Sequence, residues 1–390
     1  MSHALINRSP DLKRLRDEGY VIEVKDSHLF MYDVPYVNSQ KKVAIGTLVA
    51  PLSISMNKAS RPHNHVIHFI GTDPCDSDGK IITAIKHNQR DHRISGNILA
   101  NRSFSNKPKG GYQDFYEKFT TYAAVISHPA KDIDASVTAQ THRLVEDQES
   151  DDVFCYMDTN SSRNGTMSLT DKFRDQSVGI IGLGGTGSYI LDAIAKTPLK
   201  AIHLFDDDDF NSHNAFRTPG AASLEEVNSG LSKVQYLADR YSAMHRNILP
   251  HEIRIVKSTL DRLADLDFVF VAIDSGEHKR IIFTYLNEAN IPFVDVGIGV
   301  QWNHQRTSLR GTVRTTFGSQ DSYEHLDDVI SYAPDDKNLY DDNIQIAELN
   351  GLNAYFAVIK WKQHLGVYQK EDYANHTVLT INDSNTINDF

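Results

Sequence analysis

The chain has 390 residues, of which 40% are hydrophobic and 23% are charged, and its formal net charge is −11. This composition is typical of soluble globular proteins, and the length allows two or three domains. The sequence has no apolar run of about 18 residues, and its charged first residues, MSHALINRSPDLKRLRDEGY, do not resemble a signal peptide. We therefore expect a cytoplasmic protein with no membrane partner.

Charge is divided unevenly along the chain. Residues 1–150 contain 19 Lys and Arg against 17 Asp and Glu, which leaves 21 against 34 for residues 151–390. The second part is therefore strongly acidic. Proteins that bind nucleic acid need a basic stripe to contact the phosphates, and the sequence shows none, so we expect no nucleic-acid partner.

Cysteine and histidine give little support for a metal site. Cys75 and Cys155 are the only cysteines and form no C-x-x-C motif, so the sequence predicts neither a disulfide framework nor a zinc site. His63, His65 and His68 occur together in RPHNHVIHF. Strand alternation would place the first two on one face and the third on the other, which favours structural histidines over a metal site.

The elements of residues 1–150 predict a smaller α+β domain. The runs KKVAIGTLVAPLSIS and HVIHFIG are typical of strands, and GYQDFYEKFTTYAAVISHPA predicts a helix. The polar stretch EDQESDD, followed by DTNSSRNG, indicates a domain boundary near residue 150.

Residues 151–390 alternate between strand and helix patterns. Strands are predicted at 177–182, 201–205, 252–257, 267–273 and 292–296, and helices at 188–196, 232–246 and 276–289. This order predicts a doubly wound, mostly parallel, Rossmann-like α/β sheet. A β-like run, LRGTVRTTF, then precedes an acidic loop, SYEHLDDVISYAPDDKNLYDD, a long helix at 344–364 and a last strand in HTVLTIND.

A glycine-rich turn follows the first of these strands. In IIGLGGTGS, Gly182, Gly184 and Gly187 form G-x-G-x-x-G between a buried strand and a helix, and Gly185 is a fourth glycine. Glycine allows backbone N–H groups to approach a phosphate at the start of the helix. A dinucleotide and ATP both fit this turn.

Polar residues at the ends of later strands favour ATP. Asp206 ends the second strand, 19 residues after Gly187, where dinucleotide-binding folds place the acid that holds a ribose. Asn214, Arg217, Lys233 and Asp274 follow strand ends or the loops after them, so they could converge on the glycine turn. These groups suit a triphosphate and a metal ion, whereas the extra acids 207–209 fit solvated loop positions better than a second metal site.

With GLGGTG, DDDD, NAFR, GLSK and VAID in this order, residues 160–300 resemble the ThiF/MoeB/HesA family of ATP-dependent activators of ubiquitin-like proteins. The resemblance implies that Asn214, Arg217 and Lys233 contact the phosphates, that Asp206 holds the ribose and that Asp274 binds Mg²⁺. It implies a nucleotide site made by Gly182, Gly184, Gly185, Gly187, Asp206, Asp208 and Lys233. Arg163 matches loosely an arginine that family dimers lend to the partner's ATP site, although a surface or linker arginine fits equally well.

The resemblance implies an adenylyltransferase that activates the C-terminal carboxylate of a ubiquitin-like protein with ATP and Mg²⁺. A homodimer, a downstream conjugating-enzyme-like carrier and an N-terminal domain that recruits a partner are further expectations. That first domain resembles uncharacterised domains of bacterial relatives through FSNKPKGGYQDFYEKFTTY. A non-catalytic nucleotide-binding or scaffold module and an NAD-dependent oxidoreductase remain as alternatives.

Three departures from the family pattern bear on the mechanism. Ser275 follows Asp274 where the family commonly has Asn, and paired C-x-x-C motifs are missing, so no zinc is expected. No cysteine follows Cys155. Because related enzymes carry their catalytic cysteine after the adenylation core, we expect no thioester on this chain.

Overall fold

The computed structural model describes residues 2–56, 58–95, 98–145, 153–156, 158–164, 166–330, 332, 344–370 and 375–389. The chain divides into two compact units, Met1–Gly165 and Thr166–Phe390. This division falls later than the boundary expected near residue 150. The polar stretch that suggested that boundary, residues 146–152, lies outside the described residues.

The first unit contains a six-stranded sheet in the order β1-β2-β3-β6-β10-β7, with antiparallel neighbours. Its strands are β1 (Ile22–Lys25), β2 (His28–Val37), β3 (Val43–Pro51), β6 (Val66–Ile70), β7 (Lys86–Asn88) and β10 (Arg102–Ser105). Two short hairpins, β4 (Ile54–Ser55) with β5 (Lys58–Ala59) and β8 (His92–Ser95) with β9 (Ile98–Ala100), accompany the sheet.

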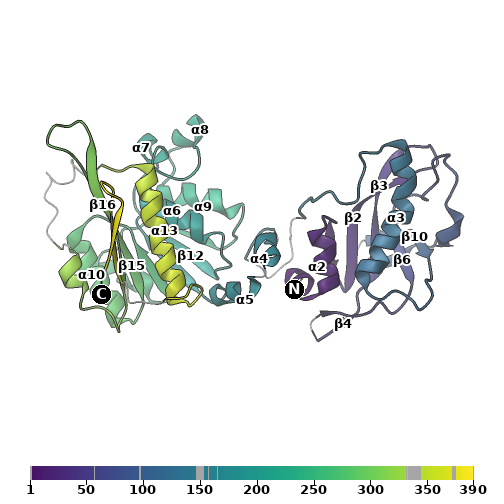
Figure 1. The fold of residues 1–390 in the computed structure, drawn as a ribbon, viewed down its shortest axis with the longest axis horizontal. Helices are drawn as coiled ribbons and strands as arrows, with labels where there is room; N and C mark the ends of the chain where they lie inside the picture. The colour runs from purple at the N-terminus through teal and green to yellow at the C-terminus, as the bar shows by residue number, and fades with distance from the viewer. Residues whose placement is uncertain are drawn as a thin grey trace. The chain divides into compact units, whose positions relative to one another are not determined.

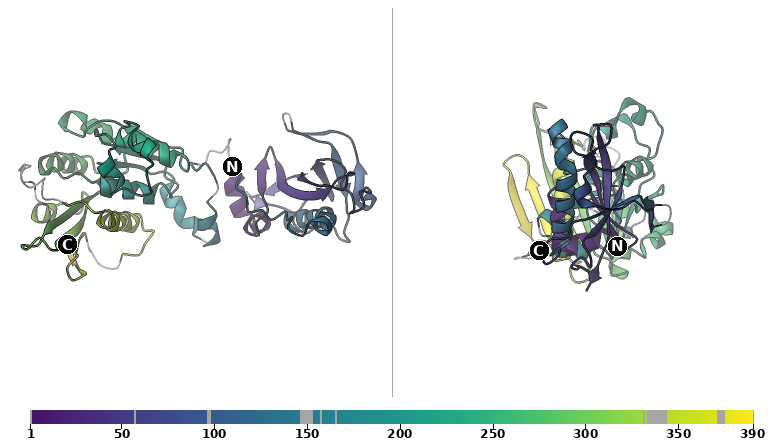
Figure 2. Two further views of the ribbon diagram at one scale, coloured as in Figure 1. Left: turned by 90° about the horizontal axis from the view of Figure 1, so that it is seen from above. Right: turned by 90° about the vertical axis from the view of Figure 1, so that its right-hand side faces the viewer.

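Helix α3 (Phe115–Ile133) covers one face of this sheet, as both views in Figure 2 show. The Asp114 side chain accepts a hydrogen bond from the Glu117 N–H and so caps the start of the helix. Phe115, Phe119, Tyr122 and Ile126 recur at helical spacing and form the core with β2 and β3. The helix expected in this region is thus confirmed. The other helices of the unit are α1 (Ser2–Arg8), α2 (Pro10–Asp17) and α4 (Thr159–Arg163).

The second unit is built on an eight-stranded sheet in the order β13-β12-β11-β14-β15-β16-β17-β18 (Figure 1). The strands β13 (Ile248–His251), β12 (Ala201–Phe205), β11 (Ser177–Ile181), β14 (Phe268–Val271) and β15 (Phe293–Trp302) are parallel. The strands β16 (Leu309–Gly318), β17 (His376–Thr380) and β18 (Asn385–Asp389) continue the sheet with antiparallel pairing.

Helices cover both faces of this sheet, which confirms the expected doubly wound α/β fold. On one face, α6 (Gly185–Ile194), α9 (Lys233–Ser242) and α13 (Ala347–His364) supply residues to a hydrophobic core that includes the fully buried Trp361. On the other face, α10 (Gly276–Glu288) supplies Ile282, Phe283 and Leu286 to a second core. The short helices are α5 (Met167–Thr170), α7 (Ser212–Ala215), α8 (Leu224–Val227) and α11 (Leu326–Val329).

Two expectations for this sheet differ from the structure. The strand expected at 252–257 is wrong: β13 lies at Ile248–His251, and residues 252–256 are not strand. β13 contains Pro250, which is tolerated because β13 is an edge strand, where the lack of an N–H costs no ladder bond. The strand expected at 292–296 is longer, because β15 pairs with β16 from Phe293 to Trp302. Most of the acidic loop, residues 331 and 333–343, lies outside the described residues.

Among the described residues, no helix is both long enough and apolar enough to span a membrane.

Candidate functional site

The glycine turn lies between β11 and α6, and its glycines serve different purposes. Gly182 has φ +88°, and a Cβ there would lie 2.4 Å from the Ala272 carbonyl oxygen. A Cβ on Gly187 would lie 1.9 Å from the Gly182 carbonyl oxygen. Gly184 is the N-cap of α6, and a Cβ there would meet no atom within 4 Å among the described residues beyond its neighbouring backbone. Packing therefore requires glycine at 182 and 187, whereas Gly184 keeps space open in front of the helix.

A cavity of about 390 Å³ lies beside this turn. Its lining comes from the ends of β11, β12, β14 and β15 and from the first residues of α6 and α10, which is where open α/β sheets bind ligands. Of the residues expected at the site, those that line the cavity are Gly182, Gly184, Gly185, Asp206, Asp208, Arg217, Lys233 and Asp274. Gly187 and Asn214 are not among the lining residues.

Asp206 is the most highly connected of these residues. One carboxylate oxygen, Oδ2, accepts the backbone N–H of Leu183 in the glycine turn at 2.7 Å. The other, Oδ1, accepts the N–H of Asp208 at 2.9 Å and the Lys233 ammonium at 3.3 Å. Only 9% of the side chain is exposed. Asp206 therefore connects the end of β12 to the glycine turn and to the start of α9.

Lys233 is paired with carboxylates in this structure. Its ammonium lies 2.5 Å from Asp208 Oδ2 as well as 3.3 Å from Asp206 Oδ1, and 8% of its side chain is exposed. The hydrogen bond from Lys233 holds the pKa of Asp208 below its usual value. To contact a phosphate, as expected from the sequence, Lys233 would have to share its ammonium between the nucleotide and these two acids.

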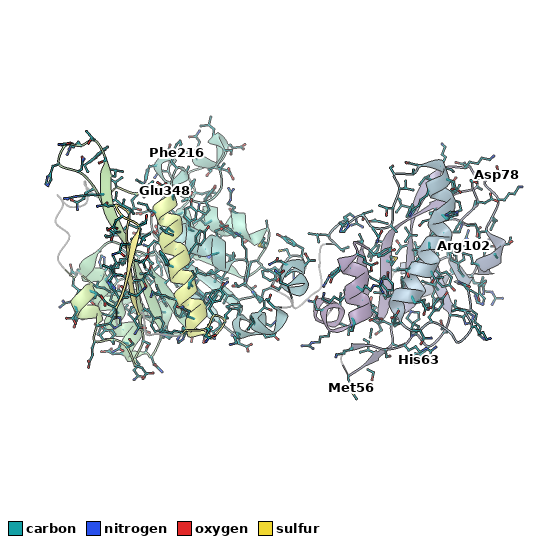
Figure 3. All side chains as sticks on the ribbon, viewed as in Figure 1. Met56, His63, Asp78, Arg102, Phe216 and Glu348 are labelled. Atoms are coloured by element: carbon teal, nitrogen blue, oxygen red, sulfur yellow. The ribbon has the colours of Figure 1, made fainter. Side chains whose placement is uncertain are left out.

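Arg217 lines the cavity. Its Nε is buried and makes no hydrogen bond among the described residues. Asn214 is 1% exposed, and its Oδ1 accepts a hydrogen bond from the Asn211 N–H at 2.9 Å. Its Nδ2 is buried and has no partner in the part of the chain that the structure describes. Between them, Phe216 points into solvent and is 85% exposed (Figure 3). Asn214 thus shapes the loop, whereas Arg217 faces the cavity directly.

Asp274 lies three residues after β14, just before α10, and lines the cavity with Ser275 and His278. The Ser275 hydroxyl oxygen is buried and has no hydrogen-bond partner among the described residues. His278 was missed in the sequence, although its place one helical turn after Asp274 is a signal that could have indicated it. Arg254 was also missed, because its segment was assigned to a strand.

The structure offers one group of metal-ligand type. Within the described part of the chain, Asp206, Asp207 and Asp208 each place a carboxylate oxygen within 4.8 Å of the others. Lys233 pairs with the first and third, and Arg254 Nε lies 3.1 Å from Asp207 Oδ1. Because each of the three acids already has a cation partner, the group is better described as an ion-pair network. Asp274 is not part of it.

The remaining candidates lie in the first unit. Arg163 is in α4, and its side chain lies outside the described residues, so its proposed role stays a prediction. His63 and His65 precede β6, and His68, within β6, stacks on His92 with ring centroids 4.2 Å apart. Burial lowers the pKa of His68 to about 4.

Cys75 is fully buried, and burial raises the pKa of its thiol above the usual value, with smaller contributions from Asp73 and Asp76. Cys155 is half-buried. A raised pKa disfavours the thiolate, so Cys75 is not prepared to act as a nucleophile.

Comparison with known proteins assigns a family to the second part of the chain. Residues 160–344 match the ThiF family, and residues 10–159 match a domain of unknown function, DUF6791. The tRNA threonylcarbamoyladenosine dehydratase of Escherichia coli (strain K12) is 32% identical over 133 residues, 32% of this chain and 47% of that protein. Ubiquitin-like modifier-activating enzyme 5 of Aedes aegypti is 24% identical over 147 residues, 35% of this chain and 37% of that protein.

Among solved structures, E. coli MccB with MccA-N7isoASN is 15% identical, with a TM-score of 0.49, over 60% of this chain and 72% of that one. This overall similarity is too low to support an inference. The chain spans about half of the E. coli dehydratase and little more than a third of the Aedes aegypti enzyme.

The different packing of the glycines can be tested by substitution. Gly187→Ala should lower the free energy of unfolding by about 1–3 kcal/mol, because the new methyl group would overlap the Gly182 carbonyl. Gly184→Ala should leave stability nearly unchanged, because its methyl group would project into open space. Denaturant unfolding of both variants measures this difference. Equal destabilisation by the two substitutions would contradict the roles assigned here.

Proposed function

Since residues 160–344 form a ThiF family domain, we propose that the protein uses ATP to adenylate a carboxylate. The observation that carries this proposal is that one cavity is lined by Gly184, which has open space beside it, and by Arg217, whose buried Nε has no hydrogen-bond partner among the described residues. The space beside Gly184 leaves room for phosphate oxygens at the start of α6, and the Arg217 guanidinium supplies a positive charge to bind them. The residues present therefore fit a polyphosphate.

In this reaction an oxygen of the substrate carboxylate attacks the α-phosphorus of ATP, and the bond to pyrophosphate breaks. A carboxylate is ionised at neutral pH, so no side-chain base is required. The protein must hold the two anions together and balance the charge that develops on pyrophosphate. Arg217 is placed to do this, and Lys233 contributes if it shifts from Asp208 toward the phosphates. Asp206, with Leu183 fixed beside it, would face the ribose.

Magnesium is part of the proposal. Asp274 lines the cavity on the side of α10, and carboxylate oxygen is the ligand that Mg²⁺ prefers. The ion would neutralise phosphate charge there. The family resemblance, which gives the acid at the end of this strand to the metal, supports Asp274 in this role.

We infer that the substrate is the C-terminal carboxylate of a ubiquitin-like protein, passed on to a conjugating-enzyme-like carrier. The family resemblance and the relative named as a ubiquitin-like modifier-activating enzyme support this inference. The other relative is named for a tRNA nucleoside, so family membership alone does not select the acceptor. A non-catalytic nucleotide-binding or scaffold module and an NAD-dependent oxidoreductase are the competing functions. Arg217 in the cavity favours a triphosphate over NAD, and an assay of catalysis separates the enzyme from the non-catalytic module.

Exchange of labelled pyrophosphate into ATP, dependent on an added acceptor protein with a glycine-ending tail, tests the adenylation step. We expect Arg217→Gln to slow the exchange by ~10²-fold, as the loss of one preorganised charge does in other active sites. Arg240→Gln, which removes a partly exposed arginine outside the cavity, is the matched control. Binding of NAD in preference to ATP, or equal exchange by Arg217→Gln and wild type, would contradict the proposal.

The protein should transfer the activated acyl group without a cysteine of its own. Cys75→Ser with Cys155→Ser should retain both pyrophosphate exchange and transfer, because neither thiol is prepared as a nucleophile. Mass spectrometry of the protein after reaction with ATP and acceptor checks this. A thioester that reductant removes, and that either single substitution abolishes, would contradict it.

We propose further that two copies of the chain assemble, as the family resemblance implies. Light scattering should then give about twice the mass of one chain, which is 43.9 kDa. A stable monomer at the concentrations used for activity would rule out a homodimer as the working form.

A further inference from the structure

Helix α13 begins at Ala347, beyond residue 344, where the ThiF match ends. In Figure 1 it is the long yellow helix of the second unit, and it packs against α6, β15 and β16. Asn350 and Asn353 are three residues apart and therefore lie on one face of the helix. Both are fully buried. Each of them contacts a different part of the cavity lining.

Asn350 contacts the glycine turn. Its Oδ1 accepts a hydrogen bond from the Thr186 hydroxyl at 3.1 Å. Its amide also fills the space beside Gly185, since a Cβ there would lie 2.1 Å from Asn350 Nδ2. Gly185 and Thr186 both line the cavity. Asn350 therefore fixes the position of the first turn of α6, where phosphate oxygens would bind.

Asn353 contacts β15. Its Nδ2 donates to the Gly297 carbonyl at 3.0 Å, and its Oδ1 accepts from the Thr315 hydroxyl at 2.8 Å. Gly297 also lines the cavity. One face of α13 thus holds two separate parts of the lining, the glycine turn and the end of the parallel portion of β15.

A buried ion-pair cluster fixes β15 next to this contact. Asp295, fully buried in β15, lies 2.8 Å from Lys279 Nζ on α10 and 2.6 Å from Arg314 Nη2 on β16. The guanidinium of Arg314 occupies the space beside Gly297, within 2.8 Å of where a Cβ would lie. Ion pairs with α10 and β16 hold Asp295, and with it β15, in place. A shift of α13 would therefore move the glycine turn but not β15, and the distance between the two would change.

The two asparagines are costly residues for a buried helix face. A buried amide must replace its hydrogen bonds to water, and Asn350 Nδ2 has no partner among the described residues. Apolar side chains, such as the neighbouring Ala354, Ala357 and Val358, would pack there without this cost. The hydrogen bonds of Asn350 with Thr186 and of Asn353 with Gly297 fix a defined geometry, which apolar packing would not do.

We propose that α13 is a clamp that sets the width of the nucleotide cavity, with Asn350 and Asn353 as its positioning residues. Neither side chain lines the cavity, so both act through the backbone and side chains that they hold. The proposal rests on nucleotide binding in the cavity as proposed above. It places in the working site a helix that lies outside the family-matched residues.

Calorimetric titration with ATP and Mg²⁺ tests the clamp. Asn350→Ala and Asn353→Ala should each weaken ATP binding about tenfold, because the two parts of the lining lose their fixed separation. Val358→Ala is the matched control, since Val358 is buried on the same helix in an apolar environment. It should lower thermal stability comparably while changing ATP affinity less than about twofold. If all three variants bind ATP alike, the clamp is wrong.

A double-mutant cycle tests whether Asn350 affects ATP binding through Thr186. Thr186→Val removes the hydroxyl that donates a hydrogen bond to Asn350. Asn350→Ala should therefore reduce the affinity for ATP less in that background than in wild type. Fully additive losses would overturn action through Thr186.

Hydrogen exchange on the wild-type protein needs no variant. ATP should slow exchange of the α13 amides around Asn353, although the helix does not line the cavity, because coupling between two sites is reciprocal. Unchanged exchange in α13 while ATP is bound would overturn the clamp alone. If wild type binds no ATP at all, the proposed function fails, and the clamp fails with it.

Discussion

The hydrogen bonds of the Asp206 carboxylate are the constraint on which the second unit depends. A carboxylate that is 9% exposed must replace nearly all of its hydration, and Asp206 does so with two backbone N–H groups and one ammonium. These partners come from the glycine turn, from the loop after β12 and from α9. Asp206, which the sequence indicates as a ligand contact, therefore has a structural role in the protein without any ligand. The cavity has its shape because Asp206 keeps these three segments together.

The sequence predicted the layered fold of the second unit well, because buried parallel strands and amphipathic helices have strong periodic patterns. It failed at β13, where Pro250 hid an edge strand and the apolar alternation of Ile253 and Ile255 imitated one. Those residues line the cavity instead. It also missed Arg254, whose segment was assigned to a strand, and His278, whose only signal is its place one helical turn after Asp274.

The sequence did not predict which side chains pair with one another. The motif residues Lys233 and Asp208 were expected to serve a nucleotide, and nothing in their spacing indicates that they bind each other at 2.5 Å. Asn214 shows the same limit, since its Oδ1 closes a turn on Asn211 while its amide nitrogen has no partner among the described residues. Long-range contacts such as that of Thr186 with Asn350 join residues far apart in the chain, and periodicity carries no information about them.

The contact between Gly185 and Asn350 has a consequence for how this sequence can vary. No atom of a ligand is needed to explain the glycine at 185, because a helix far along the chain already fills the space that a side chain would take. A larger residue at 185 would be tolerated only with a smaller one at 350, and that exchange would also remove the bond to Thr186. The two positions are thus constrained to change together. Gly185 stands in a turn usually attributed to nucleotide binding, yet in this protein it is constrained by packing against helix α13.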